Sequence, residues 1–155
     1  MDKNLMAGEL RFEEGEVKSG GKHVVYKDHL GFWTLGIGRL VDARKGGGLT
    51  DEEAAYLLNN DIDRTHAELQ RRMSCYARLS PVRQRAILNM AFQMGVDGVL
   101  KFKKMIAALE RGAYAAAAAE ALDSKWAKQD TPDRARRVAE SLRTDTPLQM
   151  KRTAK

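Results

Sequence analysis

The chain has 155 residues and a net charge of +6, and its 43% hydrophobic and 31% charged residues describe an ordinary soluble protein. No apolar run approaches the roughly 20 residues that cross a bilayer, which excludes a transmembrane helix, and a single cysteine excludes an intramolecular disulfide. The three histidines lack the spacing of zinc ligands, so no metal site is predicted. A chain of this length can form one globular unit or two small lobes that share a helix.

The N-terminal third carries signals for one short helix and a small sheet. Residues 2–13 are predicted to form an amphipathic helix that Gly15 ends. The Gly20-Gly21 pair between β-branched residues predicts a hairpin, and a second strand region is predicted over residues 32–37. Residues 44–48 have the sequence Arg-Lys-Gly-Gly-Gly and are predicted to form a flexible loop.

The rest of the chain has helical periodicity. Thr50 and Glu53 form a predicted capping box, and the helix that follows should run to about residue 72, roughly 33 Å at 1.5 Å per residue. Ser80-Pro81 begins a helix that is apolar nearly all round, which indicates burial, and Gly95 should end it. Further helices are predicted over residues 102–109 and 113–122, and a last one that Thr131 caps. We interpret Cys75 as a buried small hydrophobic residue.

These elements predict an α+β fold in a single domain over residues 1–155. We expect a small β-containing lobe over residues 13–50 and an inter-lobe helix over residues 51–73. A helical lobe would contain residues 74–155 together with residues 1–12. A substrate cleft is expected between the lobes.

Two acidic residues of the small lobe are candidates for paired acid–base chemistry. Glu14 stands at a predicted helix C-terminus, where the helix dipole disfavours negative charge, so it should tend to keep its proton. Asp28 follows a predicted strand. Carboxyl groups in different environments can hold different pKa values, and cleavage of a glycosidic bond requires such a pair. From the charge pattern alone, two solvated carboxylates are the more common case.

Four motifs in a fixed order cover about four-fifths of the chain. They are Arg11–Gly15 with Tyr26–Asp28 and Gly31–Gly38; Thr50–Ala54 with Leu58–Asp63; Arg85–Gly95; and Ser124–Trp126 with Thr131–Val138 and Arg143-Thr144. On these motifs the chain resembles the phage-type lysozymes, glycoside hydrolase family 24, and most of all those of the T-even type. The resemblance implies a lysozyme-like α+β fold. It also implies a muramidase that hydrolyses the β-1,4 bond between N-acetylmuramic acid and N-acetylglucosamine in peptidoglycan.

The resemblance assigns catalytic roles to three residues. Glu14 matches the general acid, Asp28 matches the second carboxylate, and Thr34 matches the residue that helps to place the water. Asp28 would then act as base toward that water in an inverting reaction, which needs carboxyl groups far enough apart to admit it. Adjacent helix positions point about 100° apart, so Glu13 is expected to be a solvated neighbour that does not face the cleft.

The resemblance also implies supporting and substrate-binding residues. Arg134 matches an arginine that pairs with the catalytic glutamate. Arg39 replaces a family histidine that pairs with the equivalent of Asp61, and an arginine would keep that ion pair without its pH dependence near neutrality. Leu40 and Phe92 match residues that line the substrate cleft. Behind the cleft, Gln93 and Trp126 match a packed pair.

The chain departs from the T-even pattern in two places. Glu14 and Asp28 are separated by five more residues, and the excess falls in the Gly20-Gly21 hairpin. A hairpin can absorb an insertion if its turn or a bulge adjusts. The loop from Val41 to Leu49 is much shorter than its family counterpart. An impaired lysozyme-fold module that binds peptidoglycan or a protein without cleaving it would follow if the longer hairpin displaced Asp28.

The predicted role is that of a monomeric endolysin that needs no cofactor or metal. Its polar N-terminus lacks a signal-peptide core, so we expect synthesis in the host cytoplasm, no membrane anchor, and access to the cell wall through a holin. From Ser124 onward the chain has nine basic residues against four acidic ones, but no nucleic-acid signature accompanies them. Transglycosylation and membrane disruption by the basic C-terminal helix are alternative activities.

Overall fold

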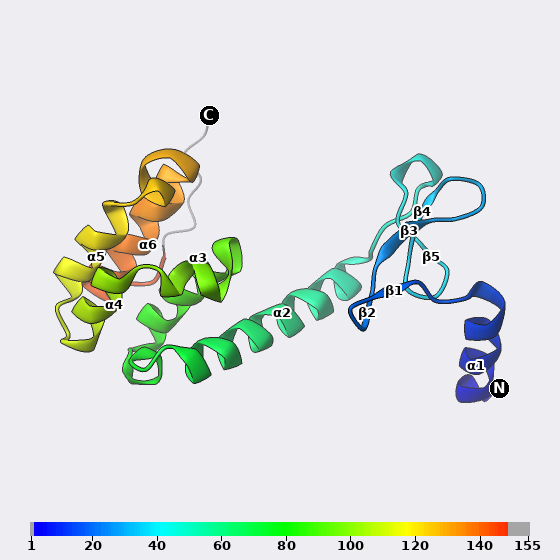
Figure 1. The fold of residues 1–155 in the computed structure, drawn as a ribbon, viewed down its shortest axis with the longest axis horizontal. Coiled ribbons are helices and arrows are strands. Elements are labelled where there is room, and N and C mark those ends of the chain that lie inside the picture. The colour runs from blue at the N-terminus through cyan, green and yellow to red at the C-terminus, as the bar shows by residue number, and fades with distance from the viewer. Residues whose placement is uncertain (1, 149–155) are drawn as a thin grey trace. The chain divides into compact units, whose positions relative to one another are not determined.

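The computed structural model describes residues 2–148 and divides the chain into two compact units, Met1–Leu57 and Leu58–Lys155 (Figure 1). The first unit holds, in order, α1 (Lys3–Glu14), β1 (Lys18–Ser19), β2 (Lys22–His23), β3 (Val25–Lys27), β4 (Trp33–Leu35), β5 (Arg39–Leu40), the 3₁₀ turn η1 (Ala43–Lys45) and the start of α2 (Asp51–Arg72). The second unit holds the rest of α2, then η2 (Tyr76–Arg78), α3 (Pro81–Leu100), α4 (Lys103–Glu110), α5 (Tyr114–Leu122), the π-helical turn η3 (Trp126–Asp130) and α6 (Pro132–Thr144). The architecture is α+β and lysozyme-like, as predicted.

Helix α1 begins and ends at residues that the local sequence specifies. The side chain of Asp2 accepts hydrogen bonds from the backbone N–H groups of Asn4 and Leu5, which have no partner inside the helix. Gly15 then takes a left-handed φ of 71° and ends the helix. This confirms the predicted stop and makes Glu14 the last residue of the helix. Helix α1 belongs to the first unit. The expected association of residues 1–12 with the helical lobe stays a prediction.

The predicted hairpin forms as a small sheet of its own. Strands β1 and β2 pair antiparallel with Ser19 opposite Lys22, and Gly20 and Gly21 between them both have positive φ, 54° and 76°. Two positive φ angles are what the tightest hairpin turns require, and glycine adopts them without strain. The extra residues between α1 and β3 therefore pair with each other as the hairpin β1–β2.

A second, three-stranded antiparallel sheet has the order β3-β4-β5. Its register places Thr34 of β4 opposite Tyr26 of β3 and opposite Leu40 of β5. After β5 the chain forms the 3₁₀ turn η1 in place of the predicted flexible loop. The carboxylate of Asp42 accepts from the backbone N–H of Arg44, and Gly46 closes the turn in the left-handed conformation.

Helix α2 starts at the predicted capping box. The backbone N–H of Thr50 donates to Glu53 Oε2 at 2.8 Å, and the backbone N–H of Glu53 donates to Thr50 Oγ1 at 3.2 Å. The helix ends at Arg72, as its periodicity predicted. None of the helices that the structure describes is long and apolar enough to cross a membrane.

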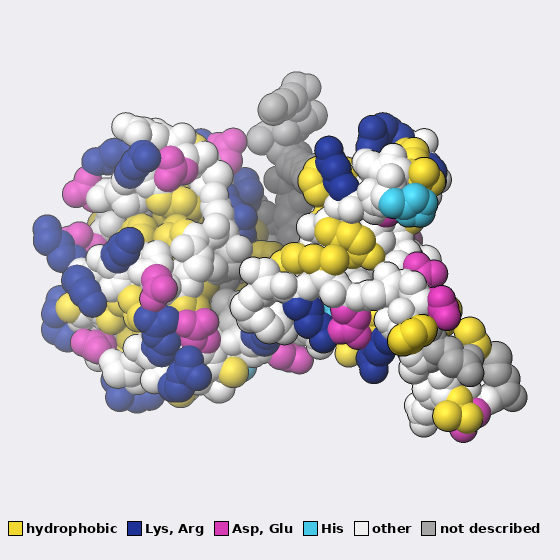
Figure 2. All heavy atoms as spheres, turned by 45° about the vertical axis from the view of Figure 1, so that its right-hand side comes forward, with side chains coloured by type: hydrophobic (Ala, Val, Ile, Leu, Met, Phe, Trp, Pro, Cys, Tyr) yellow, Lys and Arg dark blue, Asp and Glu magenta, His cyan; other side chains and the backbone are white. Residues whose placement is uncertain are grey.

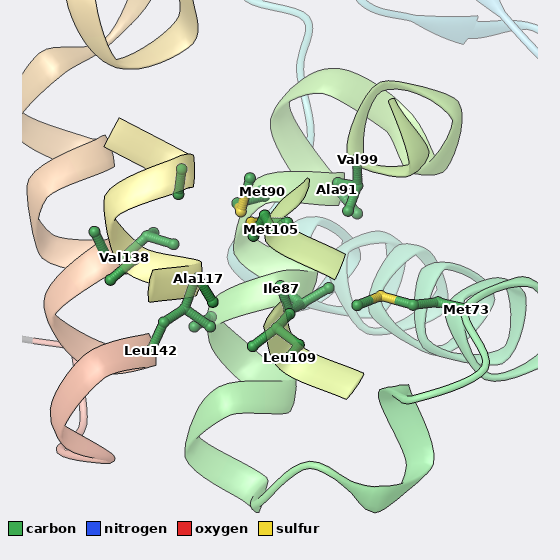
Figure 3. Packing of buried hydrophobic residues seen from close by; sticks show 14 of the residues in the cluster. Met73, Ile87, Met90, Ala91, Val99, Met105, Leu109, Ala117, Val138 and Leu142 are labelled. Carbon is green, nitrogen blue, oxygen red and sulfur yellow. The ribbon is translucent and has the colours of Figure 1, made fainter. Parts of the chain in front are cut away.

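The hydrophobic core belongs to the helical unit (Figure 3). Every buried hydrophobic residue in the described part of the chain lies between Leu69 and Leu142, and Cys75 is among them, as predicted. Helix α3 begins at Pro81 with the Ser80 hydroxyl as its cap. Gly95 breaks its helical geometry as predicted, but the helix resumes and continues to Leu100, because the residues beyond the break also pack into the core.

The helical unit carries basic and acidic side chains interspersed on its surface. Figure 2 shows Lys and Arg side chains interspersed with Asp and Glu side chains on the face of this unit in view. On α6, Arg136 pairs with Asp133, and Arg143 pairs with Glu140 at 2.6 Å. The basic excess that begins at Ser124 is therefore partly neutralised by neighbours on the same helix.

Candidate active site

A pocket of about 540 Å³ lies in the first unit and is lined by residues of α1, β3, β4, β5 and η1. It brings together four of the residues that the sequence singled out: Glu14, Asp28, Thr34 and Leu40. They come from positions spread over 27 residues, so the antiparallel sheet and the end of α1 are what gather them.

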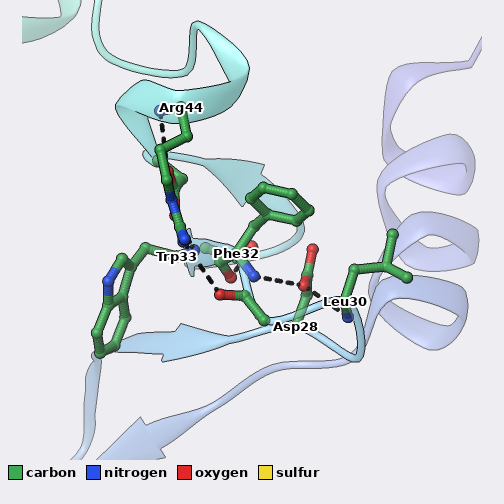
Figure 4. A network of polar contacts seen from close by, with 8 residues as sticks. Asp28, Leu30, Phe32, Trp33 and Arg44 are labelled. Atoms are coloured by element: carbon green, nitrogen blue, oxygen red, sulfur yellow. Dashed lines mark hydrogen bonds and ion pairs between the residues drawn. The ribbon is translucent and has the colours of Figure 1, made fainter.

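Asp28 is held by a tight turn between β3 and β4 (Figure 4). Its Oδ1 accepts hydrogen bonds from the backbone N–H groups of Leu30, at 2.9 Å, and Phe32, at 2.8 Å. The backbone closes the same turn, because Asp28 N–H donates to the carbonyl of Phe32 and Gly31 N–H donates to that of Asp28. Among the described residues no donor bonds to Asp28 Oδ2, so one carboxylate oxygen is fixed and the other is open.

These contacts favour the ionised form of Asp28. The N–H of Phe32 lowers the pKa of the carboxyl group most, the N–H of Leu30 lowers it further, and the charges of Lys45 and His29 add to the effect. Partial desolvation opposes them, and the net result is a pKa below the ordinary aspartate value. A carboxylate of this kind is ionised near neutral pH, which is the form that a general base requires.

Glu14 reaches the pocket from the last position of α1. Its carboxyl group lies against the backbone of Gly38, in the turn between β4 and β5. A Cβ atom added to Gly38 would come within 2.7 Å of Glu14 Oε2 and 2.9 Å of its Cδ. Gly38 also has a φ of 70°, which other residues rarely adopt. A glycine at this position therefore permits the observed place of the Glu14 carboxyl group.

Thr34 occupies the middle of β4 and is only 5% exposed. Its hydroxyl donates to the carbonyl of Phe32 at 3.5 Å, and the strands on both sides fix its backbone. Because the hydroxyl proton is donated to Phe32, the hydroxyl oxygen of Thr34 can still accept a hydrogen bond.

Glu13 also lines this pocket, although we expected only one of the two adjacent acids to face the site. Both side chains are exposed at the final turn of α1, where no following turn restricts them. Adjacent helix positions point in different directions, but two long side chains at a helix end can still reach the same pocket.

An ion pair between the buried Asp42 and the exposed Arg44 was missed by the sequence analysis. Asp42 is 4% exposed and accepts from the backbone N–H of Trp33 at 3.1 Å and from the guanidinium of Arg44 at 2.6 and 2.9 Å (Figure 4). Arg44 lowers the pKa of Asp42 strongly, and the N–H of Trp33 lowers it further. We call this contact between Asp42, Arg44 and Trp33 the Asp42 clip. Its only sequence signal is an aspartate two residues before an arginine, ahead of a glycine run.

The clip is joined to the Asp28 turn through one aromatic ring. The guanidinium of Arg44 lies 5.2 Å from the ring centre of Phe32, and the ammonium of Lys45 lies 3.8 Å from it. Phe32 is the residue whose N–H bonds to the Asp28 carboxylate. A cation and the face of an aromatic ring attract each other. The two cations of the short loop after β5 therefore hold this loop against the turn that contains Asp28.

The structure gives each member of the expected Arg39–Asp61 pair another partner. Arg39 donates to Glu53 at 2.5 Å and to the carbonyl of Gly48 at 3.0 Å, whereas Asp61 pairs with Arg64 one turn further along α2. Glu53 thus serves both the helix cap and Arg39. The pairing of Arg39 with Asp61 stays a prediction.

In the helical unit, the predicted supporting residues make contacts of their own. Arg134 donates to the side-chain oxygen of Asn89 at 2.7 Å and to its carbonyl at 2.8 Å, so its pairing with the glutamate stays a prediction. Trp126 donates to Gln93 at 3.0 Å, which confirms the packed pair. Phe92 exposes 44% of its surface, as a residue that contacts a ligand can.

The described residues contain no group of three or more His, Cys, Asp or Glu side chains arranged to hold a metal ion. The pocket itself offers one carboxylate kept ionised, one carboxyl group at a helix end, and a fixed hydroxyl.

Known proteins are similar to this chain over most of its length. The phage lysozyme family model matches residues 17–143. Probable T4-type lysozymes 1 and 2 of Dictyostelium discoideum are 31% and 29% identical to the chain, each over 163 residues that cover 88% of it and 92% of the relative. The pre-baseplate central spike protein Gp5 of Enterobacteria phage T4 is 34% identical over 86% of the chain, which corresponds to 26% of that protein. Glu14 precedes the range of the family match, but it lines the same pocket as Asp28 and Thr34, which lie inside it. The chain belongs to the phage lysozyme family.

Proposed function

We propose that the protein is a muramidase that hydrolyses the β-1,4 bond between N-acetylmuramic acid and N-acetylglucosamine in peptidoglycan. One observation carries the proposal: Glu14, Asp28 and Thr34 line a single pocket, with one oxygen of Asp28 held by two backbone N–H groups. Family membership supports glycosidase chemistry on this substrate class.

In the proposed mechanism the two carboxyl groups act on opposite sides of the scissile bond. Glu14 donates its proton to the glycosidic oxygen as the bond to the sugar carbon breaks. Asp28 takes a proton from a water molecule through its open Oδ2, and the water oxygen attacks the same carbon from the other side. Thr34 accepts a hydrogen bond from that water and aims it. The products are two shorter glycan strands; Asp28 then releases its proton to solvent, and Glu14 regains one from solvent.

The test is release of reducing sugar from purified peptidoglycan. Glu14→Gln should lower kcat by two or more decades, as general acids usually contribute about 10²–10⁴-fold, and Asp28→Asn should do the same. Glu13→Gln is the matched control, because Glu13 is the adjacent acid in the same pocket, and it should stay within a few-fold of wild type. Circular dichroism verifies that each variant is folded. A folded wild type that binds peptidoglycan but releases no reducing sugar would support the binding-module alternative.

The biological role that fits this activity is that of an endolysin released by a holin. Expression inside a bacterium should lyse the culture only when a holin is expressed with it, and Glu14→Gln should abolish that lysis. A second candidate role comes from the relative that is named a central spike protein of a phage baseplate. In that role the protein would be found in purified phage particles, which mass spectrometry of virions would detect.

A further inference from the structure

We infer that Lys45 is a specificity-determining residue that binds a carboxylate of the substrate beside the Glu14–Asp28 pocket. The choice of peptidoglycan as the ligand rests on the proposed muramidase function, whereas the position of Lys45 does not depend on it. Lys45 is the last residue of η1 and lines the pocket together with Asp28. It is exposed, so its ammonium group can be reached from solvent.

The ammonium group of Lys45 is held in place without being neutralised. It lies 3.8 Å from the ring centre of Phe32, which attracts a cation but carries no net charge. Lys45 forms no ion pair with any acidic side chain in the part of the chain that the structure describes. By contrast, the neighbouring Arg44 is used by the buried Asp42. Both cations contact the Phe32 ring, but only Arg44 is paired with a carboxylate, so the charge of Lys45 stays available to a ligand.

The turn that presents Lys45 is tied at several points. The backbone N–H of Lys45 donates to the carbonyl of Asp42, and the carboxylate of Asp42 is anchored to β4 through Trp33. Two glycines further on, the N–H of Gly48 returns to the carbonyl of Leu40. A side chain on a fixed turn loses less conformational freedom when it binds a ligand, which favours its use in recognition.

The chemistry of the substrate supplies the matching group. The sugars of peptidoglycan are neutral in their rings, and its peptides carry carboxylates close to the glycan strand. An ammonium group at the rim of the pocket offers such a carboxylate a charge-assisted hydrogen bond. A neutral glycan polymer has nothing to place there, so Lys45 would favour peptide-bearing strands over bare ones.

The experiment compares two substrates, native peptidoglycan and the same peptidoglycan with its carboxyl groups converted to amides. Lys45→Met should raise KM on native peptidoglycan about tenfold at pH 7, the effect of losing one charge-assisted hydrogen bond. The effect on kcat should be smaller, because the two backbone N–H groups that bond to Asp28 still keep it ionised at that pH. On amidated peptidoglycan the variant and the wild type should have the same KM. Lys45→Arg should recover most of the lost affinity. Lys22→Met is the matched control, because Lys22 lies in the β1–β2 hairpin outside the pocket, and it removes the same charge.

Several results would overturn the inference. An equal rise of KM on both substrates would show that Lys45 does not recognise carboxylates, and an unchanged KM on native material would show that it does not bind substrate. Binding is measured separately by sedimenting Glu14→Gln and Glu14→Gln/Lys45→Met with each form of peptidoglycan. If the wild type proves unable to cleave, the proposed function fails, and these binding measurements still decide the role of Lys45: a weaker interaction of the double variant with native material alone supports it, and any other pattern rejects it.

Discussion

Asp28 and Glu14 reach the same pocket by different means. Backbone N–H groups hold Asp28 within a turn of five residues, so its position is decided locally. Glu14 depends on a contact between distant parts of the first unit, because its carboxyl group lies against Gly38, which is 24 residues later. At the scale of single residues, the position of the proposed base is therefore set by the turn, and that of the proposed acid by its contact with the sheet.

The pH dependence of activity should reflect the contacts of Asp28. Because backbone N–H groups lower its pKa, Asp28 is half protonated at a pH below the ordinary aspartate value of about 3.9. The acid limb of kcat/KM should therefore lie below that value, measured on peptidoglycan at pH values where circular dichroism shows the protein folded. Glu16→Gln should leave the limb in place, although Lys18 lowers the pKa of Glu16 too, since Glu16 lies outside the pocket. An acid limb well above pH 4 would contradict the assignment of Asp28 as the base.

The place of Glu14 can be tested through two glycines of one turn. Gly36 and Gly38 have nearly equal positive φ angles, 68° and 70°, so alanine at either should cost about 1 kcal/mol of stability from backbone strain. Only at Gly38 does the added Cβ meet the Glu14 carboxyl group, and at Gly36 it meets open space. Gly38→Ala should therefore lose at least about tenfold more activity than Gly36→Ala, since small displacements of catalytic groups are costly. Equal activities, with equal unfolding temperatures, would show that the contact with Gly38 does not position the acid.

At the scale of elements, the Asp42 clip holds the short loop that follows β5. A short 3₁₀ turn folds back on β4 because one buried carboxylate accepts hydrogen bonds from both segments. The neighbouring Phe32 ring then receives two cations from the turn. The Asp28 turn is thus supported by a compact ionic contact in the loop that follows β5.

The clip should make stability depend on pH. The pKa of Asp42 is lowered in the folded protein, so its contribution is fully present above the unfolded aspartate value of about 3.9 and is lost as the pH falls toward the folded value. Asp42→Asn should lower the unfolding temperature at pH 7 by several degrees. The difference from wild type should shrink as the pH falls below 4. Thermal unfolding at a series of pH values measures this, and a difference that stays constant with pH would mean that the charge of Asp42 is not what stabilises the turn.

At the scale of the whole molecule, the two units differ in how they are stabilised. The helical unit has a continuous core in which α3, α4, α5 and α6 pack together (Figure 3). In the described part of the first unit, the buried residues are Thr34 and Asp42, both polar. Hydrogen bonds and short strand pairs hold that unit, and a small sheet without an apolar core is too little to be stable alone.

Separate fragments should behave accordingly. A fragment of residues 58–155 should be helical and unfold cooperatively with heat, whereas a fragment of residues 1–57 should show no cooperative transition. Circular dichroism and differential scanning calorimetry measure both. Cys75 gives an independent readout, because burial raises the pKa of its thiol and should keep it slow to react with a thiol reagent until the helical fragment unfolds. A cooperative transition in the fragment 1–57 would show that its core is larger than the described burial indicates.

The sequence by itself determined the features that depend on neighbouring residues. The stop at Gly15, the Gly20-Gly21 hairpin, the Thr50–Glu53 capping box and the start of α3 at Pro81 all follow from contacts over a few residues. The family motifs likewise named the acids that line the pocket, because chemistry constrains those residue types wherever the fold places them.

Tertiary structure decided the features whose partners lie far apart in the chain. Thr131 was expected to cap α6, but its hydroxyl bonds to Gln93, 38 residues away, and gives the helix no cap. Arg39 bonds to Glu53, and the buried Asp42 draws its donors from two segments. A polar side chain takes whichever partner the fold brings within hydrogen-bond distance, and burial makes that choice strict, since an unpaired polar group costs more there than in water. The local sequence does not determine which distant residues come within that distance.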